Sequence, residues 1–427
     1  MVSGNENTQH VTTSYLNNRN LGNAVEKLPE LYSRRENCCG CSACYSACPV
    51  NAIQMMPDKE GFLYPAVDAD KCVCCYRCLS VCAFKTDQKN RGSLEDKGTE
   101  YEDNAGQNEM YDTPISYAVK HKNREIRSSS RSGGVFTALS DAVLEENGVI
   151  FGCVLTEEFL AIHVGTENDA GRNQMRGSKY IESDLRDSFK SVKEALKAEK
   201  FVLFSGTSCQ IAGLKAFLGS KVDEHLLCVD ILCHGVPSPL VWKAYLNWLE
   251  STNNGRIEAV DFRNKRDYGW KSHFESIYFE NAPRLDSQVF KTLFFGHHIL
   301  RPGCYECPYK DVHHPGDITI ADFWGIEKAV PGFSDNQGVS LVLINNDKGK
   351  KWFEAVENSL EIQKTELTNS LQPALLEPSS RPKDRKQFWR DFETGDFGMI
   401  AERYGDFGLI NEWKRTKRQL VRKVLRH

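Results

Sequence analysis

Two runs of four cysteines constrain this chain more than any other feature. Both have the spacing CxxCxxCxxxC, and the second begins 34 residues after the first; they comprise Cys38, Cys41, Cys44 and Cys48, then Cys72, Cys75, Cys78 and Cys82. Three closely spaced thiolates of such a run hold one 4Fe-4S cubane, and the fourth binds the neighbouring cubane. We therefore expect two clusters, with the ligand sets Cys38, Cys41, Cys44, Cys82 and Cys72, Cys75, Cys78, Cys48. The alternative is zinc, which usually pairs CxxC or Cys/His ligands across a longer loop.

The composition describes a globular chain with more than one domain. It has 427 residues, 40% hydrophobic and 26% charged, and a formal charge of -4, which argues against a general nucleic-acid binder. The cysteines of iron–sulfur clusters must be reduced thiolates. Because the cytosol keeps thiols reduced, we expect a cytoplasmic protein. Residues 1–20 lack a secretory pattern, and no stretch approaches the roughly 18 apolar residues of a membrane span.

Shifts in composition along the chain predict its domain boundaries. We expect a polar extension at 1–30, a two-cluster α+β ferredoxin-like module at 31–85, a flexible linker at 86–113, the two parts of a larger domain at 114–200 and 201–375, and a tail at 376–427. Apolar runs in the larger domain predict strands at 115–120, 149–155, 201–204, 226–232, 317–321 and 338–345. Helical patterns at 134–146, 206–218 and 350–359 alternate with them, which predicts a mixed α/β domain with sizeable parallel pairing.

Two loops are candidate anion sites. The segment SSSRSGG at 128–134 lies between a predicted strand and a predicted helix, where free N–H groups and the helix dipole favour phosphate. A plain turn is the alternative. The second segment, RGSKY at 176–180, has a solvated turn as its alternative.

The remaining cysteines suggest a further metal site. Four of them lie at strand ends or turns, which can converge at one edge of a sheet: Cys209, Cys233, Cys304 and Cys307. They either complete a third iron–sulfur site, or consist of two small buried residues and a redox or zinc CxxC pair. Cys153 and Cys228 lie within predicted strands and are expected in the core. Cys39 and Cys74 are extra thiols within the two runs.

Six segments resemble the signature blocks of the coenzyme F420 hydrogenase/dehydrogenase beta-subunit family. They occur in the family's order over about residues 115–345: SSSRSGGVFTAL (128–139), RGSKY (176–180), FSGTSCQIAGLKAFL (204–218), DILCHGVPSP (230–239), DFRNKRDYGW (261–270) and DITIADFWG (317–325). The chain departs from the family at Ser208, where a proline is usual. The second cysteine run is also followed by Ala83 in place of proline.

The resemblance implies a flavin-binding larger domain with FAD and a third 4Fe-4S cluster. Carried over by motif, the FAD phosphates would lie against Ser132, Gly133 and Gly134, and the cofactor would also contact Ser178 and Lys179. The third cluster would be held by Cys209, Cys233, Cys304 and Cys307. Because Ser208 precedes Cys209, its substitution for proline affects the turn that presents this ligand.

FAD exchanges both hydrides and single electrons, so it would connect a two-electron substrate to one-electron clusters. We expect an oxidoreductase in which reduced ferredoxin or another redox protein feeds the reduction of an organic substrate or an F420-type deazaflavin. The alternative is a non-catalytic subunit that passes electrons to a separate redox enzyme. His234 is either a proton donor near the flavin or a structural hydrogen-bonder. A basic turn with Arg263, Lys265 and Arg266 either binds an anionic substrate tail or is solvated.

The C-terminal segment has the pattern of a basic amphipathic helix. From Trp413 to His427, apolar residues at helical spacing alternate with seven Lys or Arg residues. Such a helix would rest on an anionic membrane surface or on an acidic partner, or it is a solvated terminal helix.

Overall fold

A computed structural model of the chain describes residues 27–84, 110–219 and 224–408. The expected basic helix at 413–427 lies outside these ranges, as do most of the expected extension and linker. In the part that is described, no helix is long and apolar enough to cross a membrane.

The N-terminal module is small and contains two short helices and one hairpin. Each cysteine run includes a helical turn, and the antiparallel hairpin lies between the runs; the elements are η1 (Arg35–Asn37), α1 (Ala43–Ala47), β1 (Ile53–Pro57), β2 (Leu63–Val67) and α2 (Arg77–Ser80). Its core is correspondingly small, with Ile53, Phe62 and Tyr64 buried.

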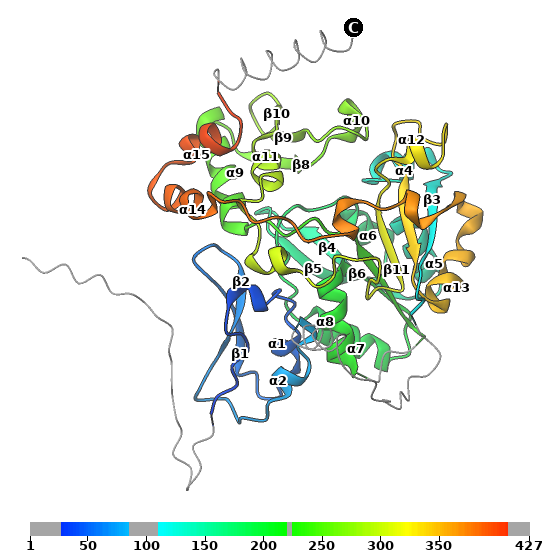
Figure 1. Cartoon of the computed structure of the whole chain (residues 1–427), viewed down its shortest axis with the longest axis horizontal. Helices are drawn as coiled ribbons and strands as arrows, with labels where there is room; N and C mark the ends of the chain where they lie inside the picture. The colour runs from blue at the N-terminus through cyan, green and yellow to red at the C-terminus, as the bar shows by residue number, and fades with distance from the viewer. Residues whose placement is uncertain (1–26, 85–109, 220–223, 409–427) are drawn as a thin grey trace, which may run out of the picture.

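The larger domain is built on an eight-stranded mixed sheet (Figure 1). Its strands are β3 (Ile115–His121), β4 (Val149–Leu155), β5 (Ala161–Thr166), β6 (Val202–Thr207), β7 (Leu226–Ile231), β11 (Ile318–Asp322), β12 (Ser340–Ile344) and β13 (Leu360–Thr365). Their order is β13-β3-β12-β11-β7-β6-β4-β5. The four strands β11, β7, β6 and β4 are parallel, and antiparallel strands flank them on both sides. The predicted parallel pairing is confirmed at the centre of the sheet.

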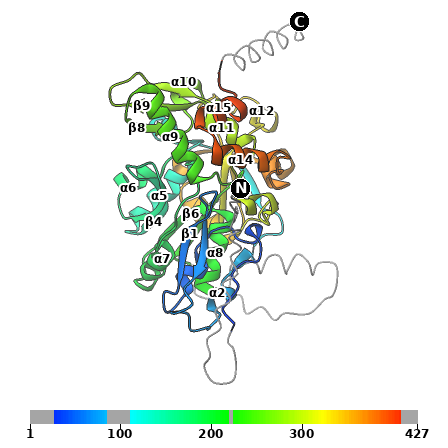
Figure 2. The same cartoon turned by 90° about the vertical axis from the view of Figure 1, so that its left-hand side faces the viewer.

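Helices cover both faces of this sheet because its central strands are apolar on both sides. In β6, Leu203 packs with one group of helices, whereas Val202 and Phe204 pack with the other. The first face is covered by α5 (Val135–Glu145), α6 (Asp169–Met175) and α13 (Asp347–Ala355), and the second by α7 (Ser188–Lys197) and α8 (Ser208–Leu218). The N-terminal module docks on the second face, where Ala43 of α1 joins the apolar cluster around α8 (Figures 1 and 2).

A second layer, which the sequence patterns did not predict, covers one end of the larger domain. A three-stranded antiparallel sheet packs with four helices: β8 (Ile257–Asp261), β9 (Glu275–Phe279), β10 (Leu285–Ser287), α9 (Pro239–Asn253), α11 (Val289–Phe295), α14 (Arg385–Thr394) and α15 (Phe397–Tyr404). Shorter helices connect the larger elements: α4 (Arg124–Ser129), α10 (Lys265–Tyr268), η3 (Pro302–Glu306), α12 (Ile326–Ala329), η4 (Glu357–Ser359), η5 (Leu367–Asn369) and η6 (Pro373–Leu375).

All six predicted strands of the larger domain are strands in the structure. The helix predicted at 350–359 is misplaced: α13 starts at Asp347 and ends at Ala355. The reason is the side chain of Asn346, which accepts a hydrogen bond from the N–H of Gly349 and caps the helix three residues earlier than expected.

Candidate functional site

The first cysteine set comprises Cys38, Cys41, Cys44 and Cys82, which the structure brings together. Cys38 interacts electrostatically with Cys41 and Cys82, and Cys44 interacts with the other three. Burial raises the pKa of the Cys38 thiol to about 11, and the nearby Arg301 acts in the opposite direction. An isolated thiol here would stay protonated near neutral pH, so a thiolate requires a compensating positive charge such as iron.

The second set lies on the outer side of the N-terminal module. Cys78 interacts electrostatically with Cys72 and Cys75, and it shares an apolar cluster with Cys48. Cys75 is exposed to solvent, whereas Cys78 is buried. Of the three sets, this is the one with a cysteine exposed at the surface.

The third set comprises Cys209, Cys233, Cys304 and Cys307. Cys304 interacts electrostatically with the other three, and Cys307 with Cys209 and Cys233. The strands explain this proximity: β6 and β7 are parallel neighbours, so the residues after their carboxyl ends meet at one edge. Cys304 and Cys307 reach the same place from η3.

Among the residues that the structure describes, no three His, Cys, Asp or Glu side chains converge tightly enough to hold one metal ion. Four thiolates around a cubane bind different iron atoms, whereas zinc ligands lie about 2.3 Å from the same ion.

The other thiols are distributed as follows. Cys228 is completely buried in β7, as expected, and Cys153 is half-buried in β4. Cys39 forms thiol hydrogen bonds with both Cys41 of the first set and Cys209 of the third. This extra thiol, for which the motifs predicted no role, lies between two cysteine sets.

The Ser/Gly loop is bound to the sheet beneath it. The Ser132 hydroxyl donates to the carbonyl of Val339 at 2.8 Å, and the N–H of Gly133 donates to Ser340 Oγ at 2.9 Å. Gly134 caps α5 with a φ of 94°, a conformation that favours glycine. Two of the donors expected to meet a phosphate are therefore already used by the protein.

The second predicted anion segment lies near this loop. Arg176 donates to Ser129 Oγ at 3.0 Å, which joins the two segments. The ammonium of Lys179 donates to the carbonyls of Gln174 and Arg176, and burial lowers the pKa of Lys179 to about 8. Ser178 is half-buried, and there is open space beside Gly177.

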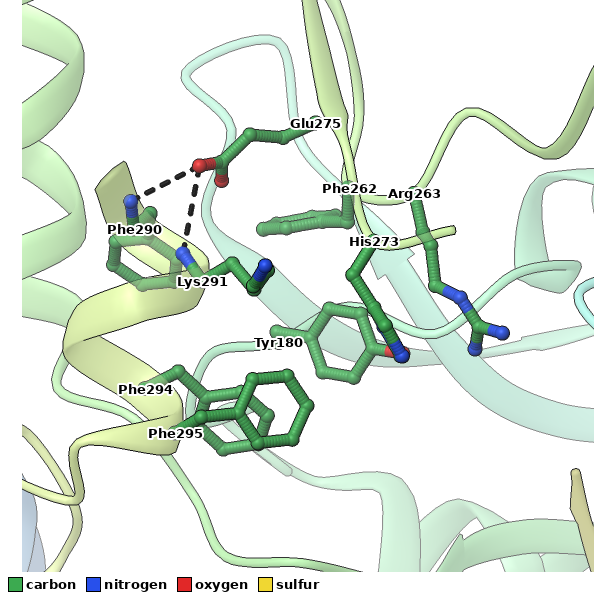
Figure 3. Close-up of a pocket in the computed structure, with 9 residues that line it drawn as sticks. All are labelled: Tyr180, Phe262, Arg263, His273, Glu275, Phe290, Lys291, Phe294 and Phe295. Atoms are coloured by element: carbon green, nitrogen blue, oxygen red, sulfur yellow. Dashed lines mark hydrogen bonds between the residues drawn. The ribbon is translucent and has the colours of Figure 1, made fainter. Parts of the chain in front are cut away.

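A pocket with aromatic walls begins at Tyr180, the last residue of that segment (Figure 3). It lies between the three-stranded sheet and α11, and its lining residues are Tyr180, Phe262, Arg263, His273, Glu275, Phe290, Lys291, Phe294 and Phe295. The Glu275 carboxylate accepts a hydrogen bond from the backbone N–H of Phe290 at 3.0 Å, and burial raises its pKa to about 7.

His234 connects the third cysteine set to this pocket. It follows Cys233 directly, and its ring contacts those of Phe294 and Phe295 edge-on at centroid distances of 5.1 and 5.2 Å. Burial lowers the pKa of His234 to about 4, so the ring is neutral at pH 7. His234 Nε2 lies 2.9 Å from Nε2 of His297, whose Nδ1 bonds the carbonyl of Ser380. When His297 is neutral, this carbonyl fixes its proton on Nδ1, so His234 donates from Nε2 and presents Nδ1 as an acceptor.

Of the two alternatives for the basic turn, an anion site or a solvated turn, the solvated turn is wrong for two of the three residues. Arg263 is buried and pairs with Asp322 at 2.5 Å, and the Lys265 ammonium donates to the carbonyls of Arg127, Ser132 and Gln337. Burial lowers the pKa of Lys265 to about 7. Only Arg266 of the three is exposed. Arg263 and Lys265 hold the Ser/Gly loop and the sheet together.

The turn before Cys209 is well defined despite the serine at position 208. Thr207 and Gln210 form a capping box that starts α8, and the Ser208 hydroxyl donates to Asp230 Oδ2 at 2.7 Å. The same carboxylate oxygen lies 2.8 Å from His314 Nδ1. Sequence reasoning missed Asp230 and His314, although a buried serine at a helix start needs a polar partner.

Comparison with known proteins gives two domain matches. Residues 199–370 match the family described as the C terminus of the coenzyme F420 hydrogenase/dehydrogenase beta subunit, and residues 37–86 match the 4Fe-4S dicluster domain. The first match begins after the blocks at 128–139 and 176–180, on which the flavin expectation rests. A search of curated protein sequences returned no match.

A chain in a solved structure of the F420-reducing [NiFe] hydrogenase complex from Methanosarcina barkeri, a xenon derivative, is also similar. The identity is 19% and the TM-score 0.41, over 71% of this chain and 95% of that one. A likeness of this degree carries no argument about function.

The dicluster match and the two cysteine runs within it define an iron–sulfur protein that transfers electrons. More particularly, residues 199–370 are similar to the C terminus of the coenzyme F420 hydrogenase/dehydrogenase beta subunit, which confirms the resemblance for the motif blocks from residue 204 onward.

Proposed function

We propose that this chain is an iron–sulfur flavoprotein oxidoreductase with three 4Fe-4S clusters and FAD. Electrons from reduced ferredoxin, or another redox protein, enter at the second set and leave beside His234, where an organic substrate or a deazaflavin is reduced. The three cysteine sets and the pocket form one continuous series of contacts, and this is the observation that carries the proposal. FAD, when bound, would convert between single electrons and a hydride.

The contacts along this route follow one another. Cys44, Cys48 and Cys78 pack in one apolar cluster, which joins the first and second sets. Cys82 of the first set and Cys209 and Cys307 of the third pack around Phe84 and Tyr309. From Cys233 the chain continues directly into His234 and the aromatic wall.

The fit of the larger domain to FAD is partial. The pocket near Tyr180 has aromatic walls but a volume of only about 10 Å³, so a flavin ring enters it only if the side chains rearrange. Open space beside Gly177 leaves access to the segment that contains Ser178. By contrast, Ser132 and Gly133 would have to exchange their present partners for phosphate. Because these two donors already have hydrogen-bond partners within the protein, a second candidate function is favoured: a flavin-free subunit that passes electrons to a separate enzyme.

Metal and flavin analysis after anaerobic purification tests both candidates. Three clusters predict about twelve irons per chain, about four for each cubane, and the oxidoreductase predicts one FAD after reconstitution. Twelve irons without FAD would favour the electron-transfer subunit. Eight irons without FAD would leave only the ferredoxin module and contradict the proposed route to the pocket.

A further inference from the structure

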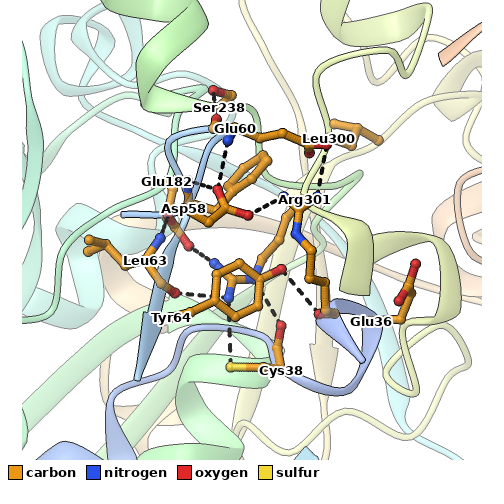
Figure 4. Close-up of polar contacts among 12 residues, drawn as sticks. Glu36, Cys38, Asp58, Glu60, Leu63, Tyr64, Glu182, Ser238, Leu300 and Arg301 are labelled. Atoms are coloured by element: carbon orange, nitrogen blue, oxygen red, sulfur yellow. Dashed lines mark hydrogen bonds and ion pairs between the residues drawn. The ribbon is translucent and has the colours of Figure 1, made fainter. Parts of the chain in front are cut away.

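One buried arginine of the larger domain contacts the N-terminal module beside Cys38 (Figure 4). Arg301 is 1% exposed, and its guanidinium donates to the carbonyls of Cys38 and Leu63, both at 2.9 Å. Its Nη2 also lies 3.7 Å from Cys38 Sγ, and its charge lies 4.1 Å from the ring centroid of Tyr64. The guanidinium is therefore in direct contact with a ligand of the first set.

The backbone of Arg301 belongs to the third site. Its carbonyl accepts a hydrogen bond from the N–H of Cys304 at 2.9 Å, and its N–H donates to the carbonyl of Val236 at 2.9 Å. Val236 in turn donates to Cys304 Sγ at 3.4 Å. One residue thus contacts the first set through its side chain and the third set through its main chain.

The ionic partner of Arg301 is Glu182, a buried carboxylate that also accepts a hydrogen bond from the N–H of Leu63 at 2.9 Å. The pair is neutral as a whole, but the positive end reaches the Cys38 sulfur. A cluster becomes more negative when it is reduced, and a cation and hydrogen bonds near its sulfurs stabilise the reduced form. Because the site is buried, water screens this interaction little.

We propose that Arg301 sets the reduction potential of the cluster held by Cys38, Cys41, Cys44 and Cys82. By holding this potential up, Arg301 makes the first cluster an acceptor for electrons from the exposed second cluster. The inference rests on the proposed assignment of the clusters. Arg301 is a positioning residue, since it contacts a ligand rather than the substrate.

The test is a redox titration of the full-length protein, followed by electron paramagnetic resonance under anaerobic conditions. Arg301→Met is expected to lower the ratio of reduced to oxidised first cluster about tenfold at a given potential, a shift of about 59 mV for one electron. Arg301→Lys keeps the charge and is expected to shift less. Cys78→Ser identifies the signal of the second cluster.

The matched control is Arg172→Met. Arg172 is also buried and pairs with carboxylates, but its partners are Asp141, Asp169 and the carbonyl of Thr137. If Arg301→Met retains its iron and titrates like Arg172→Met, the proposed role is overturned. If the wild-type protein itself shows no cluster signals, the proposed function fails instead.

A second variant covers the case in which Arg301→Met loses its iron. Glu182→Gln removes the opposing charge, retains the guanidinium and still offers an oxygen to Leu63. It is expected to move the first cluster to a higher potential, the opposite direction. An unchanged potential in Glu182→Gln would also contradict a role for this charge pair.

Discussion

Single cysteines distinguish cluster ligands from extra thiols. Cys39 and Cys209 are in contact, but only Cys209 is assigned to a cluster. We expect Cys209→Ala to lower the iron content by about four atoms per chain, and Cys39→Ala to leave it unchanged. Iron and acid-labile sulfide are measured after anaerobic purification, with Cys228→Ala as the control for a buried thiol outside the three cysteine sets. Equal iron loss in Cys39→Ala and Cys209→Ala would contradict the assignment.

At the scale of residues, the sequence predicted ligands better than their surroundings. A cysteine run specifies its own chemistry, because the spacing itself encodes the ligand set. Arg301 and Glu182 lie 119 positions apart, and neither belongs to a motif whose spacing reveals the other. Lys265 shows the same limit, since only the fold determines that its charge is buried among carbonyls.

The Ser/Gly loop shows how an element can resemble a binding site for reasons of packing. A Cβ atom at Gly133 would lie 2.1 Å from the carbonyl oxygen of Val119 and 2.7 Å from the N of Ser340. Both atoms belong to the backbone of adjacent strands or their ends, so they cannot move easily. We expect Gly133→Ala to lower the free energy of unfolding by about 3 kcal/mol, as in severe overpacking.

Gly177→Ala is the control for this prediction. It has open space around it and only a positive φ of 81°, so its cost is about 1 kcal/mol. Urea unfolding followed by circular dichroism measures both variants. If Gly133→Ala is as stable as the wild type but loses FAD, the loop has the binding role that the motif suggested.

The edge of the main sheet contains a pH-sensitive link. His163 in β5 donates from Nε2 to the carbonyl of Ser205 in β6, and in the neutral ring its Nδ1 accepts from Ser183 Oγ. Burial lowers the pKa of His163 from 6.5 to about 4. Between these values the unfolded chain binds more protons, so stability is complete above pH 6.5 and falls toward pH 4, by at most about 3 kcal/mol.

The variant His163→Gln is expected to lose this part of the pH dependence. Its amide can reproduce both hydrogen bonds without a proton to gain. Unfolding free energies at several values between pH 5 and 8 measure the effect, and the exposed His313 provides the control variant His313→Gln. A slope in His163→Gln equal to that of the wild type would show that another group dominates.

Elements were predictable where local patterns were strong. The central strands are continuous apolar runs, and their identity follows from burial on both faces. The layer formed by β8, β9, β10 and α9 was missed because its strands are short, with 5, 5 and 3 residues, although α9 buries its apolar residues at helical spacing. Trp242, Phe262 and Phe290 pack together across three elements, a relationship that no window of sequence contains.

For the whole molecule, the proposed route requires a fixed contact between the N-terminal module and the larger domain. Glu60, 4% exposed, contributes to this contact from the hairpin. Its carboxylate pairs with Arg35 at 2.9 Å and with Arg385 at 2.5 Å, and its carbonyl accepts from Ser238 Oγ at 2.5 Å. In the proposed route, electron transfer between the first and third sets depends on keeping this interface closed.

We expect Glu60→Gln to open the interface, because it leaves the Arg385 guanidinium without its buried countercharge and Arg35 with Asp58 alone. Breaking a buried pair costs about 3–5 kcal/mol, which corresponds to a loss of at least about 100-fold in local hydrogen-exchange protection. The measurement is hydrogen exchange of the backbone amides in 53–67.

The control is Glu306→Gln, which removes an exposed ion pair across the same interface. The side chain of Glu306 is 44% exposed, and that of its partner Arg34 is 59% exposed. An exposed pair contributes at most about 1 kcal/mol, so protection should change less than tenfold. Equal protection in the two variants would mean that apolar contacts between α1 and α8, rather than the Glu60 charges, hold the clusters in register.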